Sequence, residues 1–261
     1  MHRIGRVAAV VLFGLAASVA GATTAQAAAF PVNPGPIVDG RKIIGSGQNL
    51  PPIEGTTYDA GPYPAPQIEA YYTGKAIEQD RTDVTKAAWQ WVKSWTTQHC
   101  GTTSDEVRKC KAAVVFDVDE TLLNAYSYYL NADPQFTWSV DSWDAYVADC
   151  GYAGIAQTRD LYNKVKKLGL RIIIISGAAR DTKGDMVPCL KANGISGWNR
   201  YILKGQDASS ETAAEWKAQQ RARVQKDGYE IVASIGDQVS DMSNGHLMRG
   251  FLLPNTMYYL A

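Results

Sequence analysis

The stretch Phe116-Asp117-Val118-Asp119-Glu120-Thr121-Leu122-Leu123-Asn124 decides the fold. It ends an apolar run over residues 112–116 that is too short for a helix and predicts a buried strand. Because side chains alternate along a strand, the carboxylates of Asp117 and Asp119 start out facing the same side. Their mutual repulsion is severe unless a cation or a proton lies between them. The pair therefore suits a hard divalent ion and a reaction that needs an anionic nucleophile and a proton carrier.

Three other interpretations compete for this motif. A turn after a strand often contains Asp in proteins without any catalytic function. A calcium-binding EF-hand loop fits poorly, because Leu122 stands where the sixth position requires Gly and Tyr128 where the twelfth requires Glu. A glycosyltransferase-type Asp-x-Asp site, which holds a metal and a sugar nucleotide, stays open on this motif alone. The groups supplied by the rest of the chain decide between these interpretations.

Two later strands end in further polar groups. Residues 171–175 predict a β-branched strand that ends at Ser176-Gly177, where a hydroxyl and free backbone N–H groups can hold phosphate oxygens. Residues 230–235 predict another strand, followed by the carboxylates of Asp237 and Asp241, which a turn or an early helix would bring together. The glycosyltransferase interpretation explains neither Ser176 nor this second pair of carboxylates.

These segments, in this order, resemble the haloacid dehalogenase (HAD) superfamily of phosphotransferases. Within it the chain is similar to the class B-like secreted acid phosphatases (subfamily IIIB), a branch that includes plant vegetative storage proteins and a bacterial outer-membrane lipoprotein acid phosphatase. The four motifs are matched by residues 117–121, 176–177, 217 and 236–241, and the similarity extends to residues 68–75 and 253–259. It covers roughly residues 66–261. The resemblance implies a doubly wound, Rossmann-like α/β fold with a mostly parallel sheet, an active site at the strand carboxyl ends and a small helical cap insert.

The resemblance also implies the chemistry. Asp117 would be the nucleophile that attacks phosphorus and becomes an aspartyl-phosphate. Asp119 would protonate the leaving oxygen and then activate the water that hydrolyses the intermediate. Ser176 and the Gly177 N–H, together with Thr121, would bind the phosphoryl oxygens. The expected substrate is a small phosphomonoester.

A metal and a lysine complete the implied site. Mg²⁺ would be coordinated by the carboxylates of Asp117 and Asp237 and by the backbone carbonyl of Asp119, with Asp241 holding the metal shell or the lysine. Lys217 would neutralise charge on the phosphoryl group and on Asp117. Phosphoryl transfer depends mainly on such positioning of positive charge around three equatorial oxygens.

Two lysines compete for this role. Lys204 directly follows a short predicted strand, whereas Lys217 lies on a polar predicted helix that leads toward the strand before Asp237. The family has an aromatic residue, then Lys, then a basic residue a few places on, and Trp216, Lys217 and Arg221 match this pattern. Lys217 is therefore favoured, and Lys204 is expected to be a solvated surface charge.

The first 27 residues predict a secretory signal peptide. Arg3 and Arg6 precede an apolar stretch over residues 7–20 that is too short to span a bilayer stably, and Ala25-Gln26-Ala27 follows as a cleavage site. An uncleaved membrane anchor is the alternative. We therefore expect a secreted or periplasmic protein with no membrane partner after cleavage. Removal of the two arginines leaves 24 of the 26 basic residues against 26 acidic ones, and no basic stripe appears, which argues against a nucleic-acid polymer as partner.

The four cysteines favour disulfides in an exported chain, and four cysteines allow three pairings. Cys100 with Cys110 would close a short hydrophilic loop, which would leave Cys150 to tie the cap insert to Cys189. Zinc binding is not expected, because no two cysteines show close ligand spacing and only three histidines exist.

Three domain segments are expected around these motifs. Residues 28–66 are rich in Pro and Gly and predict an extended arm before the phosphatase domain over residues 67–261, in which residues 80–97 form a helix. The cap insert spans about residues 124–154. Its aromatic residues are mostly expected to pack the cap, with one or two able to stack on an aryl or nucleobase leaving group: Tyr126, Tyr128, Tyr129, Phe136, Trp138, Trp143 and Tyr146.

Two functional alternatives accompany the phosphatase interpretation. A catalytically weak storage or binding protein of the same fold would be favoured by loss of the nucleophile, yet Asp117 and Asp119 are both present. A specialised nucleotidase or phosphotransferase would use the same chemistry with a narrower site. The aromatic residues of the insert allow this second alternative without establishing it.

Overall fold

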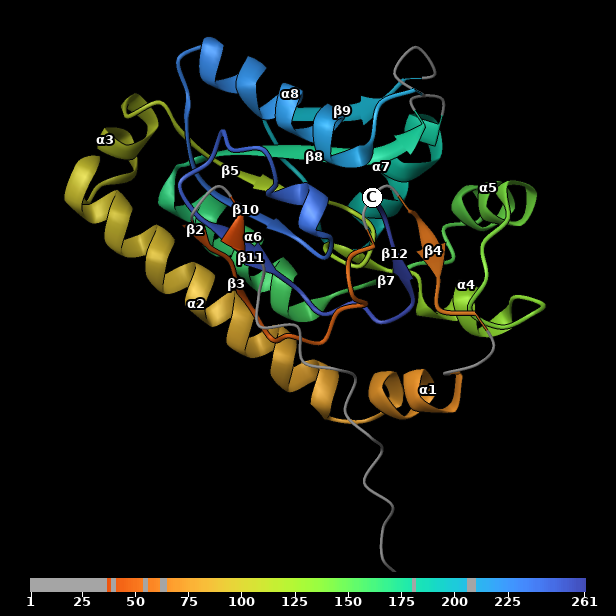
Figure 1. Ribbon diagram of the computed structural model, residues 1–261. Coiled ribbons are helices and arrows are strands. Elements are labelled where there is room, and N and C mark those ends of the chain that lie inside the picture. Colours follow the sequence, from red (N-terminus) through yellow and green to blue (C-terminus); the bar gives the residue numbers. More distant parts are fainter. Residues whose placement is uncertain (1–36, 39–40, 54–55, 62–64, 180–181, 206–209) are drawn as a thin grey trace, which may run out of the picture.

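A six-stranded sheet forms the centre of the computed structural model of the protein (Figure 1). Its strands are β3 (Ile44–Gly45), β5 (Ala112–Phe116), β8 (Arg171–Ala179), β9 (Arg200–Lys204), β10 (Glu230–Gly236) and β11 (Gly250–Leu252). They lie in the order β3-β11-β10-β5-β8-β9, and every neighbouring pair is parallel. The doubly wound, mostly parallel α/β fold expected from the sequence is thereby confirmed.

The structure describes residues 37–38, 41–53, 56–61, 65–179, 182–205 and 210–261. The predicted signal peptide, residues 1–27, lies outside this part of the chain. Among the described residues, no helix combines the length and the apolar character that crossing a membrane requires.

Helices cover both faces of the sheet because side chains of the buried strands alternate between them. Val114 and Phe116 of β5 point into a large core shared with α2 (Ala76–His99), α6 (Ala156–Leu168) and α7 (Lys183–Ala192). Ala113 and Val115 point into a smaller core under α8 (Ala213–Lys226), which packs against β8 and β10 on the opposite face (Figure 1). The continuous apolar run of residues 112–116 is thus buried on both sides.

The helices follow their sequence signals. The expected helix over residues 80–97 lies within α2, whose residues Val84, Ala88, Val92 and Trp95 are buried at helical spacing. Helix α8 begins with a capping box in which Thr212 and Glu215 satisfy each other's backbone N–H groups. The shorter helix α3 (Ser104–Lys109) has the same device at its start.

The chain reverses its direction across the sheet next to β5. From β5 it proceeds to β8 and β9 at one edge, and α8 then carries it back to β10 on the other side of β5. The loops that leave the carboxyl ends of β5 and β10 therefore diverge, which is where doubly wound folds bind their ligands. Asp117 and Asp237 are the first residues after these two strands.

The segment between β5 and α6 forms a separate layer over this end of the sheet. It contains α4 (Tyr126–Asn131) and α5 (Val140–Ala148), and it opens and closes with the antiparallel pair β6 (Leu123–Asn124) and β7 (Ala153–Gly154). The disulfide Cys150–Cys189 links it to α7, and Cys100–Cys110 joins the two ends of the loop that contains α3. Of the three possible pairings, the structure contains the expected one, in which Cys100 and Cys110 close the short loop and Cys150 bonds Cys189.

The N-terminal segment differs from the expectation of an arm that precedes the domain. Strand β3 is an edge strand of the central sheet, and β4 (Tyr58–Asp59) pairs with the C-terminal strand β12 (Tyr258–Tyr259). Strands β1 (Ile37–Val38) and β2 (Arg41–Lys42) form a small ribbon, and α1 (Ala65–Thr73) leads into α2. Short strands such as β3 and β4 pair through their backbones and require little periodicity in the sequence. The Pro- and Gly-rich composition therefore gave no sign that this segment forms strands of the domain.

Candidate active site

Asp117 enters the site as a continuation of β5. Its backbone N–H donates to the carbonyl of Ile235 at 3.0 Å, so the pairing of β5 with β10 extends to the first residue of the loop. The side chain of Asp117 is buried, and that of Asp119, two residues later, is partly exposed. Both residues therefore lie at the carboxyl end of the central strand β5.

Asp237 and Asp241 follow β10 and are brought together by a single 3₁₀ turn, η3 (Val239–Asp241). The backbone N–H of Gln238 donates to Asp241 Oδ2 at 3.0 Å, which folds the Asp241 side chain back over the end of the strand. A Cβ at Gly236 would lie 2.1 Å from this same oxygen, so only glycine permits the approach. The glycine before Asp237 is thus part of the geometry of the site.

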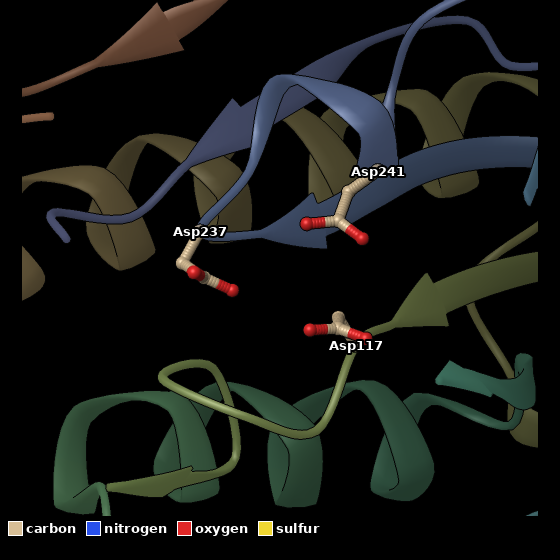
Figure 2. A group of neighbouring side chains, drawn as sticks. All are labelled: Asp117, Asp237 and Asp241. Carbon is tan, nitrogen blue, oxygen red and sulfur yellow. The ribbon is translucent and has the colours of Figure 1, made fainter. Parts of the chain in front are cut away.

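Three buried carboxylates converge between the two strand ends (Figure 2). One oxygen from each of Asp117, Asp237 and Asp241 lies within 4.8 Å of the others. Burial raises the pKa of Asp117, and burial together with the neighbouring Asp241 raises that of Asp237 to about 6. Crowded, desolvated oxygens of this kind are the donor set that a hard divalent cation prefers, and its charge would relieve their repulsion. The donor set thus fits Mg²⁺.

Amide side chains orient Asp237. Gln238 Nε2 and Asn255 Nδ2 each donate to its Oδ2 at 2.7 Å, and Asn49 Nδ2 donates to its backbone carbonyl at 3.0 Å. Thr121, expected from the sequence to bind phosphate, donates its hydroxyl to Asp237 Oδ1 at 3.3 Å. None of the three amides was among the expected site residues. Asn255 lies in the closing segment that resembles the family, whereas Asn49 carries no sequence signal.

Lys217 reaches the site from α8. Its Nζ lies 3.1 Å from Asp117 Oδ1 and also contacts Asp241 Oδ1, and its side chain is buried. Burial alone would lower the pKa of Lys217, but the carboxylates of Asp117 and Asp241 outweigh it and raise this pKa above its usual value. The ammonium therefore stays charged between two carboxyl groups.

The rival lysine is directed elsewhere. Lys204, at the end of β9, donates from Nζ to the backbone carbonyl of Glu211 at 2.6 Å and is partly exposed. Burial lowers its pKa, and the nearby positive charge of Lys217 adds to this effect. The structure thus brings Lys217 and not Lys204 into contact with Asp117.

Arg221, one turn after Lys217 on α8, holds the loop that carries Asp241. Its guanidinium donates to the backbone carbonyls of Asp241 at 2.9 Å and Gly245 at 3.1 Å, and also to that of Ser243. The side chain is 1 % exposed. Arginine suits this position because its rigid fork binds several acceptors at once. Arg221, the basic residue of the sequence pattern, therefore supports the loop that carries Asp241, and Lys217 supplies the positive charge beside Asp117.

Ser176 and Gly177 lie at the end of β8, next to β5. Ile174 of β8 is the register partner of Phe116, the last residue of β5. Ser176 therefore lies two residues past the level at which β5 ends and Asp117 begins the loop. The pairing of β8 with β9 shifts between Ser176 and Ala179, and the Ser176 hydroxyl accepts the N–H of Ala178 at 3.1 Å. Gly177 is exposed, and a Cβ there would have no neighbour within 4 Å. At this irregular strand end, Gly177 is therefore open to solvent.

Asp119 is contacted from the insert. The Tyr152 hydroxyl donates to Asp119 Oδ1 at 2.8 Å, and burial and the Asp119 charge raise the pKa of Tyr152 well above its usual value. Burial raises the pKa of Asp119 and the hydrogen bond from Tyr152 opposes this rise. Tyr152 was not among the aromatic residues singled out from the sequence, because it lies at the very end of the insert.

Glu120 is buried behind the same loop. It has a positive φ of 52°, is 0 % exposed, and accepts the N–H of Ala125 at 2.6 Å. Its other oxygen faces Arg81 at 3.5 Å and the Tyr72 hydroxyl at 3.3 Å. Burial raises the pKa of Glu120 to about 8, although the charge of Arg81 opposes the rise. This cluster ties helices α1 and α2 to the loop after β5.

The aromatic residues of the insert pack mainly on one another. Tyr128 contacts Trp143 edge-on with ring centroids 4.9 Å apart, and Tyr129 stacks on Tyr258 at 5.3 Å. Trp138 is 48 % exposed. A cavity of about 560 Å³ opens in the insert, but its lining, which includes Ser127 and Tyr146, contains none of the site carboxylates. The packing interpretation of these rings therefore holds for most of them.

Comparison with known proteins gives the family. Residues 61–261 match the family described as HAD superfamily, subfamily IIIB (acid phosphatase). The chain belongs to this family. In this HAD protein the four expected motifs lie on β5 and its loop, β8, α8 and the loop after β10, which are the elements that meet at the carboxyl ends of the central strands.

Relatives of this HAD protein include both enzymes and storage proteins. It is 33% identical over 150 residues to acid phosphatase 1 of Solanum lycopersicum, covering 56% of this chain and 58% of the relative. It is 32% identical over 202 residues to vegetative storage protein 1 of Arabidopsis thaliana, covering 74% of this chain and 69% of the relative. The chain thus spans less than two thirds of the first relative's length and slightly more than two thirds of the second relative's length.

A solved structure shares the fold. The class C acid phosphatase from Bacillus anthracis superimposes with a TM-score of 0.60 over 73% of this chain and 82% of that chain, at 15% sequence identity. At this level of identity the similarity concerns the architecture alone.

Proposed function

We propose that this protein is an acid phosphatase that hydrolyses small phosphomonoesters through an aspartyl-phosphate on Asp117, with Mg²⁺ as cofactor. The observation that carries the proposal is the contact of the buried Lys217 ammonium with Asp117, beside the carboxylates of Asp237 and Asp241. The Lys217 ammonium, together with a cation that the carboxylates would hold, would offset the negative charge of an incoming phosphate, so that Asp117 can approach it as nucleophile.

In the first half of the reaction, a carboxylate oxygen of Asp117 forms a bond to phosphorus while the ester P–O bond breaks. The electron pair of that bond stays on the leaving oxygen, which takes the proton of Asp119 and departs as an alcohol. Lys217 supplies positive charge beside Asp117, and the N–H of the exposed Gly177 would donate to a phosphoryl oxygen.

In the second half, water attacks the phosphorus of the aspartyl-phosphate and gives its proton to the Asp119 carboxylate. The acyl phosphate bond breaks, its electron pair returns to Asp117, and inorganic phosphate is released. Asp119 is again protonated, and the cycle closes. The partial exposure of Asp119 suits a group that must exchange protons with both an alcohol and water.

Asp117 and Asp237 would hold Mg²⁺ with their carboxylates, and Asp119 would add its backbone carbonyl. The ion would supply charge compensation between the anionic nucleophile and the anionic substrate. Asp241, which already bonds Lys217 and the N–H of Gln238, would keep these groups in place.

We further propose that the protein acts outside the cytoplasm. Two disulfides in one chain support an oxidising compartment, and the predicted signal peptide agrees with it. The long similarity to a vegetative storage protein favours one alternative, a storage or binding protein of the same fold.

Activity assays separate these functions. The purified protein should hydrolyse 4-nitrophenyl phosphate and a panel of sugar, nucleoside and amino-acid phosphates with Mg²⁺, and should lose this activity in EDTA. Asp117→Asn should abolish turnover, whereas the matched control Asp105→Asn, at a side chain that is 82% exposed, should not. A wild-type protein that is folded, loaded with Mg²⁺ and inactive on every phosphate would leave the storage function as the better proposal.

A further inference from the structure

Tyr152, near the end of the insert, contacts the catalytic loop through its side chain. Its hydroxyl donates to Asp119 Oδ1 at 2.8 Å across a separation of 33 residues, and its side chain is 7% exposed. A phenolic hydroxyl is protonated at neutral pH and a carboxylate oxygen can only accept, so Tyr152 acts as the donor. The contact therefore places a fixed donor from the insert on the second carboxylate of the motif.

The ring of Tyr152 is held from three directions. It packs edge-on against Tyr146 with centroids 4.9 Å apart and against Trp143 at 5.8 Å. A Cβ at Gly151 would lie 2.2 Å from the Tyr146 ring, so the chain before Tyr152 is pressed against this cluster. One residue earlier, Cys150 is bonded to Cys189 on α7. The hydroxyl is thus positioned by covalent and packing constraints before any substrate arrives.

This arrangement distinguishes the two oxygens of Asp119. The carbonyl oxygen of a protonated carboxyl group is a better acceptor than its hydroxyl oxygen, so donation from Tyr152 to Oδ1 favours the proton of Asp119 on Oδ2. The same bond stops the carboxyl group from rotating between its two oxygens. Proton transfer requires this kind of fixed geometry between acid and leaving oxygen.

We propose that Tyr152 is a positioning residue for phosphoryl transfer, which holds Asp119 so that Oδ2 delivers the proton to the leaving oxygen and later receives one from water. The inference rests on the proposed role of Asp119 as acid and base. Tyr152 exchanges no proton itself: the proton passes from Asp119 Oδ2 to the leaving oxygen as the P–O bond breaks, and the Tyr152 hydrogen stays on its own oxygen throughout.

A purely structural role would look different. If the bond to Asp119 only anchored the insert, its removal would slow the enzyme equally for all substrates of similar shape. If it positions the acid, its removal matters most where the leaving oxygen needs a proton. 4-Nitrophenolate leaves readily as an anion, phenolate less so, and benzyl alcohol only after protonation. These three leaving groups differ in basicity with little difference in shape.

The experiment compares kcat/KM of wild type and Tyr152→Phe for 4-nitrophenyl, phenyl and benzyl phosphate, since kcat/KM reports the step in which the leaving group departs. We expect a loss of about tenfold or more for benzyl phosphate and less than about threefold for 4-nitrophenyl phosphate, as for a hydrogen bond to a charged group. Circular dichroism and thermal unfolding establish that the variant is folded.

Tyr128→Phe is the matched control. It removes a hydroxyl from a buried tyrosine of the same aromatic cluster, where the lost bonds go to Ser139 and Ser142 and not to Asp119. The control should show no dependence on the leaving group. An equal fall for all three substrates in Tyr152→Phe, or the same pattern in Tyr128→Phe, would overturn the inference.

A double-mutant cycle supplies the second test. In an Asp119→Ala background there is no carboxyl group to hold, so adding Tyr152→Phe should change single-turnover hydrolysis of phenyl phosphate by less than about twofold. A further fall of the size seen in the wild-type background means that Tyr152 acts by another route, and the inference is then wrong. Failure of the proposed function is distinguishable, because the wild type itself would then hydrolyse none of the three esters.

Discussion

Replacement of Lys217 by Met tests the electrostatic core of the site. The Lys217 side chain is 4% exposed and contacts Asp117, 7% exposed, and Asp241, 3% exposed. Lys217→Met keeps the length of the chain but leaves two buried carboxylates without their cation. Removal of one member of a buried ion pair costs about 3 to 5 kcal/mol. This is a large part of the roughly 5 to 15 kcal/mol that stabilises a typical domain.

Lys204→Met is the matched control. Lys204 loses a hydrogen bond to the carbonyl of Glu211 from a partly exposed side chain, which should cost only about 0.5 to 1.5 kcal/mol. The free energy of unfolding of both variants is measured by urea denaturation in EDTA, so that no cation substitutes for the ammonium. With Mg²⁺ present, the deficit of Lys217→Met should shrink, because the metal compensates the same carboxylates.

Turnover gives an independent measure of the same contact. Loss of one positive group beside the transferred phosphoryl should lower kcat on 4-nitrophenyl phosphate by about 10²- to 10³-fold in Lys217→Met. Lys204→Met should stay within a few-fold of wild type. If both variants lose the same stability to within about 1 kcal/mol and the same activity, Lys217 does not carry the role given to it here.

Three further predictions concern the metal, the disulfide and the N-terminal segment. Saturating Mg²⁺ should raise the Tm of the wild type but not of Asp237→Ala, with a gain of about 2.7 kcal/mol at a hundredfold excess over Kd. The folded-state pKa of Asp237, about 6, lies above its ordinary value, so the metal-free folded protein binds this proton more tightly than the unfolded chain does. The metal-free protein should therefore lose stability as the pH rises toward 6. Over the same pH range, calorimetry should show a growing increase in unfolding free energy on addition of Mg²⁺. Replacing Cys150 and Cys189 by Ser removes a link across 39 residues and should cost about 4 kcal/mol by the chain-entropy estimate. In urea denaturation under oxidising conditions, the midpoint of this variant should be lower than that of the wild type. Asn49→Ala removes the bonds to the carbonyls of Asp237 and Leu253 and should cost about 1 to 3 kcal/mol and weaken Mg²⁺ binding, measured by titration calorimetry; unchanged affinity would mean that the N-terminal segment does not support the site.

The elements that carry the chemistry were largely predictable because their signals are local. The strand expected over residues 112–116 has the same bounds in the structure, and those expected over 171–175 and 230–235 differ only by extending further at their carboxyl ends. Apolar runs of this length bury themselves as parallel strands, and Asp117 and Asp119 then follow directly at the carboxyl end of β5. Family resemblance added which strands meet at one end of the sheet.

The partners of each functional side chain were not predictable in the same way. Thr121 turned out to bond Asp237, and the amides of Asn49 and Asn255 reach that residue from opposite ends of the chain. Such bonds depend on distances between segments separated by up to 188 residues, which no periodicity encodes. Composition even argued against a role for the segment around Asn49.

The sequence by itself determined the fold class, the order of the motifs and the residue types needed for phosphoryl transfer, because each depends on neighbours along the chain. The sequence pattern favoured Lys217 over Lys204, and the tertiary structure shows Lys217 in contact with Asp117. Tertiary structure alone decided that Tyr152 rather than another ring of the insert reaches Asp119. Only the packing of α8 against the sheet places one ammonium, and not the other, between two buried carboxylates.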